Sequence, residues 1–312
     1  MIAKTVSSII QLTFIVAMAP LQIGLIRSTK ALLEGRGGGR LLRPWREIIK
    51  LLKKDTLRYS NGSQVIAVGS VVTLTSSLVL ALVVPALTLN SIIHPDFFVI
   101  ISLLTVSAIS QGIVGLANGT SFGGMGSSRH LTLLALAEPT LLISIYALSI
   151  SSHTTNLDTI IQLRASHPMQ IISPVGILVV ASLVIAVLSE TGRLPVDNPT
   201  THLELTMIHE AMTQESSGRD LAFQELASAV KLSVLSALLA NLLIPWPLSS
   251  SLSIGLILSA AALGIKLAIV GVVLSAGETY LAKVRLFRVP ELLAGSLALA
   301  FVAVIISGVT AK

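Results

Sequence analysis

The sequence predicts an all-α integral membrane protein with about eight transmembrane helices. The chain has 312 residues, of which 53% are hydrophobic and only 12% are charged. A soluble globule of this length needs a more polar exterior than that, whereas a lipid environment removes the requirement. Because backbone polar groups in lipid must be paired within their own segment, each crossing is expected to be a helix.

Eight apolar stretches reach the roughly 20 residues that are needed to cross the hydrocarbon core. They cover residues 6–26, 65–89, 97–117, 131–150, 171–189, 230–247, 251–275 and 291–309. No clear internal repeat is visible, although secondary transporters are commonly built from repeats. We therefore predict a single polytopic membrane domain over residues 1–312, with a large acidic loop between helices 5 and 6.

The basic residues predict the orientation. Seventeen Lys and Arg residues fall in the loops 27–64, 118–130, 190–231 and 276–290, and three fall in the termini and the opposite loops. This bias predicts a protein of the cell (inner) membrane. The four charged loops are expected in the cytoplasm, and both termini on the periplasmic or extracellular side. The net charge of +6 thus reflects membrane topology, and no nucleic-acid partner is expected.

Two further segments are expected on the cytoplasmic side. Residues 44–59 begin with Pro44, which suits a first helical turn, and they alternate apolar with basic residues. This pattern predicts an amphipathic helix on the membrane surface, held by anionic lipid or by a partner protein. The glycines between Ser121 and Ser128 lack the Lys of a phosphate-binding loop and predict a tight turn.

The loop over residues 190–230 is the strongest candidate for a functional site. It contains seven carboxylates: Glu190, Asp197, Glu204, Glu210, Glu215, Asp220 and Glu225. Apolar residues separate many of them, which indicates that one face of the loop is buried. Packed carboxylates raise one another's pKa and can exchange protons near neutral pH. The alternative is a solvated loop.

Charged residues within the predicted helices support an ion-carrying role. Glu138 precedes Pro139 in the fourth helix, Lys266 lies in the seventh helix, and Glu278 follows just after that helix. Ionisable groups at this depth usually face a bundle interior or a wet cavity. The alternative is a static ion pair between Glu138 and Lys266.

Metal and thiol chemistry are not expected in this chain. It has no cysteine, which excludes disulfides and thiolate ligands. His209 and Glu210 begin an H-E-x-x-H pattern, but Thr213 stands where the second histidine is required. His202 and His209 are seven residues apart and have no further ligands nearby in the sequence, so a metal site is not predicted.

The central loop resembles a known family. The stretch Glu190-Thr-Gly-Arg193-Leu-Pro195-Val-Asp197, followed by Glu204-Leu205 and Glu215, is similar to the membrane subunit that bears the quinone site in respiratory complex I. The phrase Pro195 to Met212, the segment Gly119 to Arg129 with Glu138-Pro139, and the segment Ala282 to Pro290 resemble the hydrogenase-type branch. That branch contains formate hydrogenlyase subunit 4 and hydrogenase-4 component C.

The resemblance implies a membrane-anchoring, ion-coupling subunit that is not itself catalytic and binds no cofactor. Its expected partners are hydrogenase-like large and small subunits and an iron–sulfur subunit in the cytoplasm, together with antiporter-like membrane subunits. These partners would carry the iron–sulfur clusters and a nickel–iron centre. The residues implied in coupling or proton relay are Glu138, Glu190, Arg193, Asp197, Glu204, Glu210, Glu215, Lys266 and Glu278.

In this role Arg193 is expected to orient the loop carboxylates through paired hydrogen bonds. Two alternatives remain open. One is the quinone-site subunit of a complex I-type dehydrogenase, although Thr200 and His202 replace carboxylates found in that branch. The other is a secondary ion transporter that acts alone.

Overall fold

The computed structural model describes residues 2–57, 63–88, 95–166, 172–197, 207–245 and 254–310. Within these ranges the chain is helical and contains no named strand. The helices are α1 (Ile2–Leu33), α2 (Arg43–Leu52), α3 (Ser63–Val83), α4 (Phe97–Ala117), α5 (Ser121–Ser152), α6 (Leu157–Ser166), α7 (Pro174–Glu190), α8 (His209–Thr213), α9 (Gly218–Leu243), α10 (Ile254–Tyr280), the 3₁₀ turn η2 (Leu286–Arg288) and α11 (Val289–Thr310).

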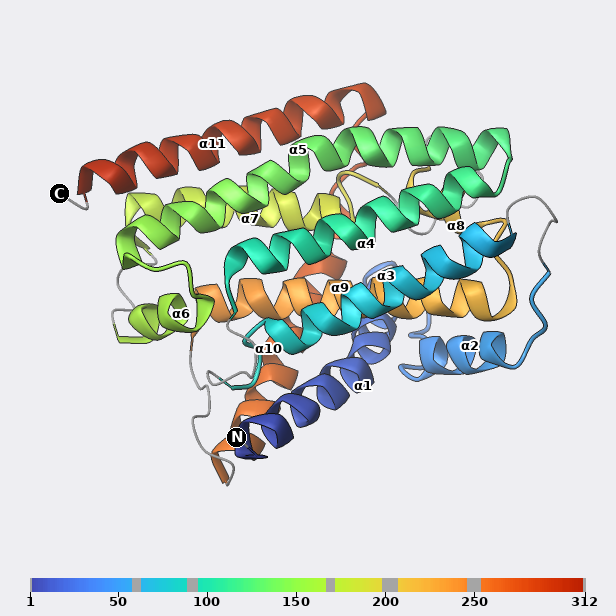
Figure 1. Cartoon of the computed structure of the whole chain (residues 1–312), viewed down its shortest axis with the longest axis horizontal. Coiled ribbons are helices and arrows are strands. Elements are labelled where there is room, and N and C mark those ends of the chain that lie inside the picture. The colour runs from blue at the N-terminus through green and yellow to red at the C-terminus, as the bar shows by residue number, and fades with distance from the viewer. Residues whose placement is uncertain are drawn as a thin grey trace.

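Most of the long helices run along the long axis of the molecule (Figure 1). α11 packs on α5 and α7, α3 lies between α4 and α9, and α1 contacts α9 and α10. The N- and C-termini lie at one end of the bundle, and α2 and α8 lie at the other (Figure 1). Residues such as Ile15, Leu80, Phe97 and Leu235 form the buried apolar core that joins these layers.

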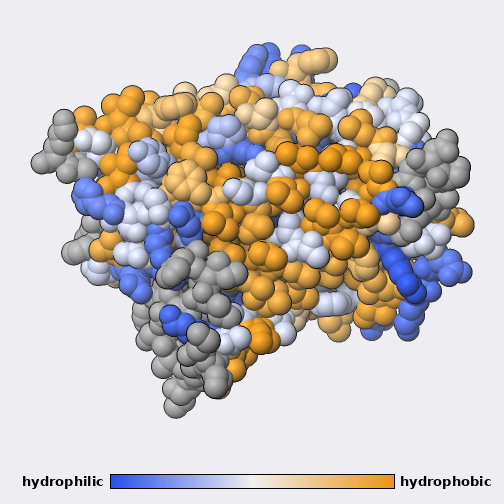
Figure 2. Space-filling view, viewed as in Figure 1, coloured by the Kyte–Doolittle hydropathy of each residue, from blue (hydrophilic) through white to orange (hydrophobic). Residues whose placement is uncertain are grey.

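The eight expected crossings correspond to eight helices. Seven described helices are long and apolar enough to span a membrane, and the fifth expected crossing is the shorter apolar helix α7. The exposed side chains of these helices are largely aliphatic, and Figure 2 shows hydrophobic residues over the middle of one face with hydrophilic ones toward both ends. The chain is therefore a multi-pass membrane protein of all-α fold.

The length of α7 positions the candidate site. Its 17 residues extend about 26 Å at 1.5 Å per residue, whereas the hydrocarbon core is about 30 Å thick. α7 ends at Glu190 near the middle of the molecule, well short of the side on which α5 and α9 begin (Figure 1). Beyond it the chain continues through residues 191–197, and α8 packs against α4 and α5.

Several helices begin or end differently from the sequence-based expectation. The expected turn around Gly123, Gly124 and Gly126 is wrong, because these residues form the first turns of α5. A Cβ at Gly126 would lie 2.8 Å from the Ala211 Cβ, so the glycine lets α8 pack closely against α5. α9 begins at Gly218 rather than near residue 230, and Glu278 lies within α10 rather than after it.

The amphipathic helix α2 is shorter than expected and ends at Leu52. Residues 53–57 lie outside the helix, and Leu57 binds Ser217 through both backbone groups: its N–H donates to Ser217 Oγ (2.8 Å), and its carbonyl accepts from that hydroxyl (2.9 Å). α2 is also attached to α1, since Trp45 Nε1 donates to the Ala17 carbonyl at 3.1 Å. Glu47 accepts hydrogen bonds from Arg27 and Arg43, both at 2.9 Å.

Candidate functional site

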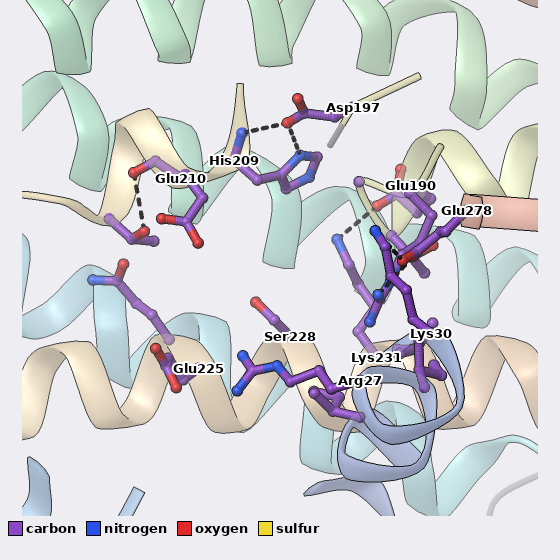
Figure 3. Close-up of a pocket in the computed structure, with 18 of the residues that line it drawn as sticks. Arg27, Lys30, Glu190, Asp197, His209, Glu210, Glu225, Ser228, Lys231 and Glu278 are labelled. Carbon is purple, nitrogen blue, oxygen red and sulfur yellow. Dashed lines mark hydrogen bonds and ion pairs between the residues drawn. The ribbon is translucent and has the colours of Figure 1, made fainter. Parts of the chain in front are cut away.

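A cavity of about 630 Å³ lies where α7 ends. Its walls come from α1, α4, α8, α9, α10 and the segment that follows α7, and Figure 3 shows the polar side chains that surround it. Charged residues of both signs line it. The carboxylates are Glu34, Glu190, Asp197, Glu210, Glu225 and Glu278, and the cations are Arg27, Lys30, Arg36, Arg43, Arg193 and Lys231. The lining thus contains six carboxyl groups and six basic side chains.

The innermost ion pair joins Glu190 to Lys231. Lys231 Nζ on α9 donates to Glu190 Oε1 at 3.0 Å, and the two residues are 4% and 2% exposed. At this burial neither charge has water to replace its partner, so removing one member strands the other at high cost. The pair therefore ties the end of α7 to the middle of α9.

A second buried carboxylate, Glu278 near the end of α10, has two cations. Arg193 Nη1 donates to Glu278 Oε1 at 2.9 Å, and Lys30 Nζ donates to Glu278 Oε2 at 3.4 Å. Lys30 comes from α1 and Arg193 from the segment after α7. The expectation that Arg193 pairs with the loop carboxylates is therefore wrong for the described residues, because its ion pair there is with Glu278.

Asp197 is held by both charges and backbone donors. The N–H groups of Ile208 and His209 donate to its Oδ2 at 3.2 and 3.1 Å, and Lys283 Nζ donates to its Oδ1 at 3.3 Å. Burial alone would raise the pKa of Asp197, but the contacts with His209 and the charge of Lys283 outweigh it and lower the pKa to about 2. The expectation of a raised pKa is wrong for this carboxyl, which stays ionised.

The path of the chain around Asp197 depends on a glycine. Gly192 has φ +60, and a Cβ there would lie 2.5 Å from His209 Nδ1. Only glycine adopts this conformation without cost while leaving room for the ring. The Glu-Thr-Gly-Arg sequence therefore turns sharply after α7, which puts Glu190 and Arg193 on the cavity wall.

Five of the residues implied by the resemblance line this cavity: Glu190, Arg193, Asp197, Glu210 and Glu278. Glu215 is exposed outside it, and Glu204 lies outside the described residues. Glu138 is in the interior of α5, with Thr105 nearby and with Glu190 and Lys231 within electrostatic range. Among the described residues, Glu138 Oε1 has no hydrogen-bond partner.

The expected ion pair between Glu138 and Lys266 does not form. Lys266 Nζ instead donates to Asn241 Oδ1 at 2.9 Å and to the Ile244 carbonyl at 2.6 Å. Asn241 Nδ2 in turn donates to the carbonyls of Pro85 and Ala86. Lys266 therefore satisfies backbone groups released where α9 ends, away from the cavity.

Sequence reasoning missed several members of the site. Lys231 is a single Lys within the apolar run Ala229 to Leu235, a pattern that could have marked it as a buried charge. Lys30 and Lys283 could not be assigned as partners, because their carboxylates are distant in sequence. His130 gave no signal, and its ring meets that of His209 edge-on with centroids 5.0 Å apart.

The chain belongs to the NADH dehydrogenase family, whose model matches residues 6–308. It is 28% identical over 299 residues to formate hydrogenlyase subunit 4 of Escherichia coli (strain K12), an alignment that covers 95% of this chain and 96% of that protein. It is also 28% identical over 282 residues to hydrogenase-4 component C of the same organism, with 88% and 87% of the two chains covered.

The likeness to the complex I branch covers less of the chain. An NADH-quinone oxidoreductase subunit of Rickettsia africae (strain ESF-5) is 27% identical over 173 residues, which cover 53% of this chain and 49% of that protein. A chain from the membrane-bound sulfane sulfur reductase, an archaeal respiratory membrane complex, shares the fold with a TM-score of 0.84 and 16% identity, covering 97% and 99% of the two chains. The resemblance to the hydrogenase-type branch is confirmed.

Proposed function

We propose that this chain is the membrane-anchoring, ion-coupling subunit of a hydrogenase-type complex related to respiratory complex I. One observation carries the proposal: a cavity lined by paired, buried charges lies at the C-terminal end of α7. Subunits of such complexes match the chain over nearly its full length, which supports the same assignment.

The charge pairs provide a physical means of coupling. Ion pairs in a low-dielectric interior respond strongly to any nearby change in charge. A proton or electron gained by a partner next to the cavity would shift the balance between Glu190 and Lys231, and that pair is within electrostatic range of Glu138. A change at the rim can thereby alter the charge state of a carboxyl inside the bundle.

The orientation follows from the same residues. The end of the helix bundle that holds the cavity also carries α2 and most of the Lys and Arg residues. This end therefore faces the cytoplasm, and the protein lies in the cell (inner) membrane. There it meets the hydrogenase-like and iron–sulfur subunits, while antiporter-like subunits pack against the helices within the membrane. Because this chain has no cysteine, thiolate-bound iron–sulfur clusters belong to the partners.

The test is a pull-down in mild detergent with a tag at the C-terminus, since α11 ends away from the cavity (Figure 1). Mass spectrometry and metal analysis of the eluate should find large, small, iron–sulfur and antiporter-like subunits with iron and nickel. The same subunits without nickel would indicate a related complex that passes its electrons to another acceptor. A chain that purifies alone, and that moves ions by itself in liposomes, would overturn the proposal in favour of a transporter.

A quinone-site subunit is the second candidate, and one observation favours it. An apolar pocket of about 230 Å³ lies between α1 and α10, lined by residues that include Met18, Leu21, Leu25, Leu41 and Leu267. A long hydrocarbon tail fits such a lining, whereas the charged main cavity does not suit one. A photoreactive quinone analogue that labels the 18–25 segment in the purified complex, in competition with unlabelled quinone, would support this candidate.

A further inference from the structure

His209 is a half-buried histidine of the cavity that the coupling proposal leaves unexplained. It is the first residue of α8 and lines the cavity beside Asp197 (Figure 3). Among the described residues, neither of its ring nitrogens has a hydrogen-bond partner, although both are buried. Buried nitrogens without partners cost free energy, so a native protein that keeps them has a reason to do so.

The surroundings of the ring suggest that reason. Its Nδ1 lies 3.6 Å from Asp197 Oδ2, slightly beyond hydrogen-bond length. On another side its ring lies edge-to-face with the His130 ring, whose Nε2 lies 3.2 Å from the Ala108 carbonyl on α4. His209 therefore stands between a carboxylate on the cavity wall and a second imidazole that is only 3% exposed in the bundle.

The chain also reserves space for this ring. A side chain at Gly192 would collide with Nδ1, Cε1 and Cγ of His209, all within 2.9 Å. The backbone of Gly192 and the carboxylate of Asp197 thus fix where the imidazole can lie without bonding its nitrogens. The imidazole therefore lies with Asp197 on one side and His130 on another.

We propose that His209 carries protons between the cavity and His130. A proton from cavity water binds one ring nitrogen of His209, and the N–H bond at the other nitrogen breaks as its proton passes to His130. No electrons are transferred, and Asp197 stabilises the transient imidazolium. This inference rests on the proposed coupling function and assigns the residue by which the cavity communicates with the interior.

The competing explanation is that His209 only fills space against Gly192. Chemical rescue separates the two, because a space-filling role does not need an ionisable imidazole. We would prepare His209→Ala and His209→Gln in the complete complex, with His153→Asn as the matched control. His153 is an exposed histidine at the C-cap of α5 with φ 51, a conformation that asparagine tolerates.

The complex is reconstituted in liposomes with reduced methyl viologen as the electron donor, and proton movement per electron is followed with a pH-sensitive dye. Both His209 variants should lose proton movement about tenfold or more, with viologen oxidation retained. Millimolar imidazole should restore it in His209→Ala, whose side-chain space opens onto the cavity, and not in His209→Gln. The His153 variant should resemble the wild type.

Full proton movement in His209→Gln would overturn the inference, as would equal loss in His209→Ala with and without imidazole. Failure of the underlying function would look different. In that case the tagged wild-type chain would bring down no redox subunits, or the wild-type complex would oxidise viologen without moving protons.

Discussion

Glu190 Oε1 lies 3.0 Å from Lys231 Nζ, and this ion pair joins the last residue of α7 to the middle of α9. Both residues are at most 4% exposed. Because each charge is solvated chiefly by the other, losing one member would leave the other buried without compensation where α7 meets α9.

Replacing Lys231 by Met should therefore destabilise the chain by about 3–5 kcal/mol, the cost of leaving a buried charge without its partner. Adding Glu190→Gln should recover much of the loss, because the double variant buries no charge. Thermal unfolding in detergent measures both effects. Lys50→Met, at an exposed lysine of α2, is the control, and a single variant as stable as this control would contradict the prediction.

Arg193→Ala should cost less stability than Lys231→Met. Glu278 loses Arg193 at 2.9 Å but keeps Lys30 at 3.4 Å, so its charge remains partly compensated. The double variant Arg193→Ala/Lys30→Met should approach the full cost of a stranded buried charge, about 3–5 kcal/mol. The measurement is the unfolding temperature of the two single variants and the double variant in one detergent, which ranks their losses of stability. Additive small losses would argue against a shared role at Glu278.

Glu138→Gln should uncouple ion movement from electron transfer while leaving subunit assembly intact, because it removes a charge and changes little of the shape. Assembly is read from the pull-down and coupling from proton movement per electron in liposomes. Glu291→Gln, an exposed carboxyl in the first turn of α11, is the matched control. Normal coupling in the Glu138 variant would remove this residue from the proposed relay.

Asp197 should make the chain sensitive to acid. Its pKa is lowered from 3.8 to about 2 in the folded state, so it contributes stability above pH 4 that is lost as the pH falls toward 2. The contribution is about 2 kcal/mol at neutral pH. Asp197→Asn should unfold earlier than the wild type at pH 7, and the difference should shrink between pH 5 and pH 3. A difference that does not change with pH would contradict the assignment.

Asp158 on α6 should behave in the opposite sense. Burial raises its pKa from 3.8 to about 7, and Lys4 offsets this only partly. The unfolded carboxyl ionises first as the pH rises, so this group costs stability progressively from pH 4 upward. Asp158→Asn should be more stable than the wild type at pH 8 and equal to it near pH 4. Measuring unfolding at both values tests the sign, with Asp96→Asn as the control because asparagine can keep the N-cap of α4.

The membrane class and the family could be predicted from the sequence, because both depend on local information. Apolar stretches about 20 residues long can only be helices in lipid, and the central motif is nearly continuous in the chain. The predicted helix ends were less accurate. α5 and α9 extend into polar sequence because their first turns pack against α8 and the 55–57 segment, contacts that no local pattern records.

The sequence by itself determined that carboxylates gather in one loop and that Glu138 lies inside a helix. Only the tertiary structure decided which cation each carboxylate meets. Lys231, Arg193, Lys30 and Lys283 come from distant parts of the chain, and a short α7 allows them to converge. Ion pairing depends on distance in space, so carboxylates that are crowded by like charges along the sequence are neutralised by cations in the folded chain.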